Sequence, residues 1–135
     1  MAQGAIISIT DNRPRYSMAV YRIDWTAAAN GSFTMALDMP MFGSIMHFVT
    51  KPGATAPTDL SDVTLTDQHG FDVFNGLGTD KVDATDTLQT AVMTEATIAA
   101  VKYGVNPSIA CMNPTLTILN NSVDSAKGTI WIYLR

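Results

Sequence analysis

Aspartate is the residue type in this chain best suited to binding a cation, because seven of its twelve acidic residues fall between residues 59 and 86. Calcium takes several oxygen ligands, often from one loop. The stretch 79–86 places acids three residues apart, but it lacks the alternating ligands and closing glutamate of an EF-hand. Aspartate also flanks turns, where its side chain accepts hydrogen bonds from nearby backbone N–H groups. We therefore predict that these residues shape loops and that the chain has no metal site. They are Asp59, Asp62, Asp67, Asp72, Asp80, Asp83 and Asp86.

Histidine and cysteine are too few and too far apart to form a recognisable catalytic or zinc motif. His47 has apolar neighbours and is expected in the core or an interface, whereas His69 precedes a glycine and is expected in a solvated turn. Cys111 also has apolar neighbours, a setting in which thiols are usually inert. We predict no catalytic residue and no cofactor, and hence a protein that is not an enzyme.

Methionine is unusually frequent, with eight in 135 residues, and several lie close together near two phenylalanines. Flexible thioether side chains adapt to irregular contacts and recur at binding surfaces. Core filling is the competing explanation. An apolar corner at a turn favours a contact with another subunit. The predicted interface residues are Met39, Met41, Phe42, Met46 and Phe48.

Charge and composition narrow the possible partners. Charged residues make up 15% of the chain, against about 25% in an ordinary soluble domain. This shortage indicates either a surface that meets protein or a polar surface of Thr, Ser and Asn. The net charge of −4 and the scattered basic residues argue against nucleic acid and anionic membranes as partners. No signal peptide or apolar helix of membrane-spanning length is recognisable, and the single cysteine fits synthesis in a reducing cytoplasm.

Alternation of apolar and polar residues with a period of two predicts strands along most of the chain. We expect hairpins at Asn30-Gly31 and over residues 121–128, a turn at residues 68–70 and a short return strand over residues 71–74. Residues 83–103 favour strand and irregular structure, with one short helix as the alternative. The last strand, over residues 129–134, is apolar on both faces and is expected to be central or covered on both sides. The other expected strands cover residues 5–10, 16–25, 32–37, 41–50, 62–66 and 114–120.

About eight short strands at this spacing predict an all-β fold, an antiparallel β-sandwich of the jelly-roll or immunoglobulin type. Nothing marks a second domain, so residues 1–135 are expected to form one sandwich.

Several stretches resemble the small β-rich structural proteins of tailed bacteriophage particles. The likeness covers about two thirds of the chain and adds nothing between residues 80 and 113. It is carried by Ile23-Asp24-Trp25 with Ala29-Asn30-Gly31-Ser32-Phe33-Thr34, by residues 51–58 and 62–67, by Gly70-Phe71-Asp72-Val73-Phe74-Asn75-Gly76-Leu77-Gly78, and by residues 116–118, Asn121 and residues 126–135.

The resemblance implies a virion protein that is made in the host cytoplasm and assembles with itself and with a major capsid or other virion protein. Capsid decoration (cement) proteins are the first expectation, because a small acidic sandwich without long arms suits a surface trimer. A neck or tail subunit is the second expectation.

Two further functions compete with assembly. One is a carbohydrate- or calcium-binding sandwich that uses Trp25, Tyr21 or Tyr103 as stacking platforms, although Trp25 and Trp131 both lie in strand patterns expected to be buried. The other is a small hydrolase with an unrecognised site.

Overall fold

The computed structural model describes residues 3–11, 18–98 and 101–135, and within these residues it contains eleven strands and no helix. The strands are β1 (Gly4–Asp11), β2 (Ala19–Thr26), β3 (Phe33–Ala36), β4 (Met41–Pro52), β5 (Asp62–Thr66), β6 (Leu88–Ala91), β7 (Thr94–Ile98), β8 (Val101–Val105), β9 (Ser108–Cys111), β10 (Thr115–Leu119) and β11 (Lys127–Leu134). Residues 16 and 17 of the strand expected over 16–25 lie outside the described residues. The prediction of an all-β antiparallel sandwich is confirmed.

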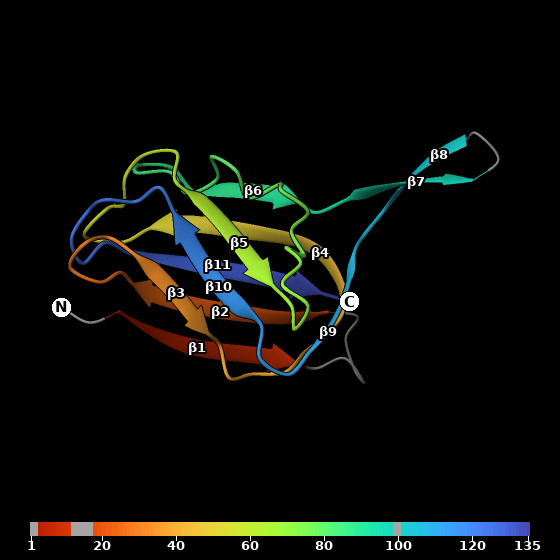
Figure 1. Ribbon diagram of the computed structural model, residues 1–135, viewed down its shortest axis with the longest axis horizontal. Coiled ribbons are helices and arrows are strands. Elements are labelled where there is room, and N and C mark those ends of the chain that lie inside the picture. Colours follow the sequence, from red (N-terminus) through yellow and green to blue (C-terminus); the bar gives the residue numbers. More distant parts are fainter. Residues whose placement is uncertain (1–2, 12–17, 99–100) are drawn as a thin grey trace.

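Two sheets of unequal size form the sandwich (Figure 1). The larger has six strands, in the order β1-β2-β11-β4-β6, with β9 also pairing with β4. The smaller has three strands, in the order β3-β10-β5, and lies across one face of the larger sheet (Figure 1). All of these pairings are antiparallel. The smaller sheet therefore leaves the opposite face of the larger one as a surface of the described chain.

The core lies between the sheets and follows from strict alternation along the strands. In β11, Ile130, Ile132 and Leu134 are fully buried while the residues between them are partly exposed. Val63 and Leu65 of β5, expected to point inward, are fully buried as well. Ring contacts link the larger sheet to β3 and to the turns that follow β5. Trp25 packs on Phe33 with ring centroids 5.7 Å apart, and Phe48 stacks on Phe74 at 4.3 Å.

Both predicted hairpins are wrong, because each connection crosses from one sheet to the other. β2 and β11 belong to the larger sheet, whereas β3 and β10 belong to the smaller one. Gly31 does have the positive φ that favours glycine, 85°, but a turn conformation does not decide whether the flanking strands pair. The two crossing segments instead bind each other, since Asn121 Nδ2 donates to the Gly31 carbonyl at 2.8 Å.

Residues 68–70 form the expected turn, but residues 71–74 make only an isolated bridge, Thr66 to Asp72, before a series of turns. The described residues of the segment 83–103 form strands rather than a helix, because β6, β7 and the first part of β8 fall there. The count of about eight strands was too low because β6, β7, β8 and β9 were not predicted individually, although the strand expected over residues 71–74 did not form. β11 is central, as expected, since it pairs with both β2 and β4.

The β7–β8 hairpin projects away from the sandwich (Figure 1). The two strands pair with each other and with no other strand of the described residues. This projection contradicts the expectation of a sandwich without long arms. No helix in the part of the chain that the structure describes is long and apolar enough to cross a membrane.

Candidate assembly surface

The clustered aspartates hold loops through hydrogen bonds to backbone N–H groups. Asp72 Oδ1 accepts from the N–H groups of Leu65 and Phe74, each at 3.1 Å, and its Oδ2 accepts from Gly76 at 3.0 Å. Asp67 Oδ1 accepts from His69 at 2.9 Å and Phe71 at 3.1 Å. The loop-shaping role predicted for these residues is therefore confirmed for both of these aspartates.

The remaining acids of this region make similar bonds. Asp62 Oδ1 accepts from the Asp80 N–H at 2.8 Å, and Asp59 Oδ1 accepts from the Ala84 N–H at 3.1 Å. Hydrogen bonds from the N–H groups of Asp86 and Thr85 hold the pKa of Asp83 below its ordinary value. Among the residues that the structure describes, no three His, Cys, Asp or Glu side chains gather closely enough to bind a metal ion.

The predicted interface residues divide between the core and the surface. Met41 and Phe48 are fully buried, so they cannot contact another subunit, and the prediction is wrong for both. Their positions in β4 point between the sheets, where apolar residues serve the core. Met39 and Met46 are partly exposed, and the Phe42 side chain is 47% exposed. For these three residues the interface remains a prediction.

Met46 is partly exposed because it lies in a β-bulge. Tyr133 pairs with His47 while the next residue, Leu134, pairs with Ile45, which leaves Met46 as the extra residue of β4. Sequence alternation gives no sign of such an insertion, because both faces of β4 are apolar. Which residues of β4 are buried and which are exposed could therefore not be predicted from the sequence.

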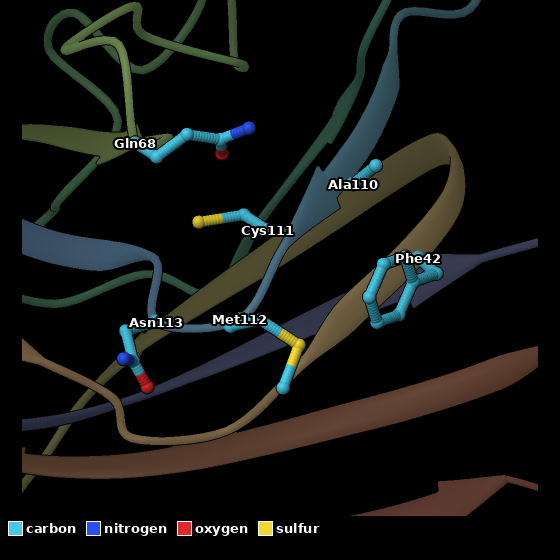
Figure 2. A pocket seen from close by; sticks show the side chains of 6 residues that line it. All are labelled: Phe42, Gln68, Ala110, Cys111, Met112 and Asn113. Atoms are coloured by element: carbon cyan, nitrogen blue, oxygen red, sulfur yellow. The ribbon is translucent and has the colours of Figure 1, made fainter.

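A shallow pocket of about 290 Å³ lies beside the paired ends of β4 and β9. Figure 2 shows its lining, in which Met112 lies between Asn113 and Phe42. Met112 is 62% exposed, and Cys111 is the one lining residue with a titratable group. The pocket has no residue that could act as a general base beside a nucleophile, so its chemistry suits apolar contact. It is lined by Phe42, Gln68, Ala110, Cys111, Met112 and Asn113.

The most extensive feature is the face of the larger sheet turned away from the smaller sheet, which we call the outer face. Its centre is a grid of three residues from each of three adjacent strands, β2, β11 and β4, set by the pairing register. One row is Val20, Tyr133 and His47; the next is Arg22, Trp131 and Val49; the third is Asp24, Thr129 and Lys51.

Aromatic groups dominate the middle of the outer face. His47 and Tyr133 stack with ring centroids 4.1 Å apart, and the Arg22 guanidinium lies 5.5 Å from the centre of the Trp131 ring. Burial lowers the pKa of His47 below its ordinary value, because desolvation disfavours the imidazolium. All four side chains retain exposed surface.

The outer face becomes polar toward its third row. Arg22 Nε lies 3.3 Å from Asp24 Oδ1, and the Thr129 hydroxyl donates to the same oxygen at 2.6 Å. An apolar and aromatic centre with a polar border is the usual composition of a protein interface. Sequence reasoning missed this surface because Trp131 was expected to be buried, although the apolar character of both faces of β11 was a sign of it.

Two of the three proposed stacking platforms for carbohydrate are buried. Trp25 and Tyr21 are 2% and 4% exposed and belong to the core. The side chain of Tyr103 lies outside the described part of the structure. Trp131, which was expected to be buried, lies on the outer face.

Comparison with known proteins adds no function. No protein-family model matches the chain, and no curated protein matches it. Among solved structures, the chain is similar to a cupin domain from Bordetella pertussis Tohama I, at 14% identity and a TM-score of 0.31, over 98% of this chain and 94% of that one. No inference is drawn from a likeness at this level.

Proposed function

We propose that the chain is a non-catalytic structural subunit that packs against copies of itself and against a second protein through its outer face. The observation that carries this proposal is the aromatic centre of that face, formed by Trp131, Tyr133 and His47. Aromatic residues and arginine are enriched at protein interfaces, and an apolar patch with a polar border usually marks a contact. The low charge of the chain favours the same role.

The particle to which the subunit belongs is, in this proposal, a tailed-bacteriophage virion. The support is the resemblance of the strand and turn segments, and the role assigned first is capsid decoration. The projecting β7–β8 hairpin favours the second candidate, a neck or tail subunit, because an arm that leaves the sandwich can reach a neighbouring subunit.

Labelling particles directly tests the proposal. Particles made by the virus or prophage that encodes the chain are purified and incubated with gold-conjugated antibody against it. Label spread over the capsid supports decoration, and label at the junction of capsid and tail, or along the tail, supports the second candidate. Absence of the chain from purified particles, by mass spectrometry and by label, would contradict a virion role.

A further inference from the structure

Strand β1 forms one edge of the larger sheet, so a row of its backbone N–H and C=O groups points away from β2. Natural proteins usually protect such an edge with charge, proline or a bulge. The sequence from Gly4 to Thr10 contains no charged residue and no proline. Its pairing with β2 runs without a register shift from Gly4 to Asp11. Within the described residues β1 is therefore a long and regular edge, whose one charged residue, Asp11, stands at its end.

The edges of the smaller sheet are covered by the chain itself. The Gln3 side-chain amide binds both backbone groups of Thr34 in β3: its Nε2 donates to the carbonyl at 2.6 Å, and its Oε1 accepts from the N–H at 3.0 Å. The outer edge of β5 bonds to the loop that follows it. There the Val63 N–H donates to Gly78 at 3.0 Å, and the Leu65 carbonyl accepts from Val73 at 2.7 Å.

The opposite edge of the larger sheet is formed partly by β6, which is only four residues long. A short edge strand is itself a protection against pairing with other chains. The eight-residue β1 is twice as long. Within the described residues, β2 is its only strand partner.

The side chains of β1 are suited to a neighbour that is also apolar. Ile6 is 70% exposed on the side of the outer face, and Ser8 beside it is exposed. On the other side Ala5, Ile7 and Ile9 are only partly buried against the core. A strand alongside β1 would cover both rows, and it would extend the core and the outer face together.

We propose that β1 pairs in antiparallel orientation with β1 of a second copy, about a two-fold axis at Ile7. This register places Ile6 opposite Ser8 of the other copy and Ala5 opposite Ile9, and it pairs every residue from Gly4 to Thr10. No charged residue meets a like charge. The inference rests on the proposed assembly role and names its first partner, a second copy of this chain.

The pairing joins the two larger sheets into one and makes the two outer faces continuous. Because a two-fold contact uses the same patch on both copies, it closes as a dimer or as an assembly with an even number of copies. It therefore replaces the trimer implied by the phage resemblance.

Charge reversal across the axis is a direct test. The double variant Ile6→Lys, Ser8→Lys places two like-charge pairs directly opposite each other, and Ile6→Glu, Ser8→Glu does the same with the opposite sign. We expect each variant alone to raise the dissociation constant of the dimer about tenfold or more. We expect an equimolar mixture of the two variants to restore the dimer, measured by sedimentation equilibrium. A folding defect could not be rescued in this way.

The matched control is Thr34→Lys, Ala36→Lys, which makes the same charge change at two exposed positions of β3 and is expected to leave the dimer intact. The inference is overturned by a wild-type trimer, by a wild-type monomer, or by Lys and Glu variants that dimerise as well as the wild type. A wild-type monomer would also contradict packing of the chain against copies of itself, but none of these results decides whether the chain is part of the particle. Antibody labelling of particles therefore tests the proposed function separately.

Discussion

The two tryptophans lie on opposite faces of the larger sheet, so replacing each by alanine separates folding from assembly. Trp25 is 2% exposed and packs on Phe33, and truncating such a core side chain costs about 3–5 kcal/mol of unfolding free energy. That is a large part of the total of roughly 5–15 kcal/mol available to a domain. We expect Trp25→Ala to be unfolded or strongly destabilised.

Trp131→Ala should behave differently. Its ring is partly exposed, and the Arg22 contact contributes about 0.5–1 kcal/mol at such a site. Total destabilisation of the isolated subunit should therefore stay near 1–2 kcal/mol. In an assembled interface, removing a central tryptophan costs about 2 kcal/mol or more, which raises the dissociation constant about 30-fold.

Urea denaturation at a concentration where the subunit is monomeric measures the unfolding free energy of each variant. Sedimentation equilibrium measures the dissociation constant of the assembly. If Trp131→Ala lowers stability as much as Trp25→Ala, then Trp131 belongs to the core and the outer face has been wrongly described. If Trp131→Ala leaves both stability and self-assembly unchanged, the outer face is not an interface between copies of this chain. Binding of a soluble polysaccharide that is lost in Trp131→Ala would favour the carbohydrate alternative.

Three further predictions concern the fold. Gly78→Ala should lower the unfolding free energy by about 2–4 kcal/mol in urea denaturation, because the alanine Cβ would lie 1.9 Å from the Val63 carbonyl oxygen. Gly4→Ala is the neutral control, because open space surrounds Gly4. Asp72→Ala should lower the unfolding free energy by about 2–4 kcal/mol in urea denaturation, because three N–H groups lose their acceptor. Asp72→Asn keeps an acceptor oxygen and should lower it less, so equal losses for the two variants would contradict the role of these hydrogen bonds. The pKa of His47 is lowered in the folded state, so the unfolded chain takes up the proton at a higher pH than the folded chain does. Stability should therefore fall as the pH drops through about 6.5. Thermal melts at about pH 5.5 and 7.5 should show a smaller difference for His47→Gln than for the wild type.

The alternation of residues predicted most strands because burial between two layers imposes a period of two. The pattern in β5 predicted both its extent and its inward residues correctly, whereas for β11 it predicted residues 129–134 of the observed Lys127–Leu134. The pattern could not say which strands pair. The turn at Gly31 has the conformation expected of it, yet it carries the chain between sheets, and that choice depends on contacts with Asn121, ninety residues away.

The candidate site was only partly predictable for a similar reason. Phe42 was predicted as a contact residue from its place at an apolar corner and its side chain is exposed, but Met41 and Phe48, predicted on the same grounds, face the core. The outer face is made of residues from three strands that are far apart in sequence. Only the register between those strands brings Trp131, Val49 and Arg22 together.

Sedimentation equilibrium of the intact wild-type chain over a wide concentration range tests the claim of self-assembly most directly. We predict a closed oligomer with an even number of copies, which dissociates reversibly on dilution. A single species with the mass of one chain, at every concentration up to the limit of solubility, would contradict self-assembly through β1 and the outer face.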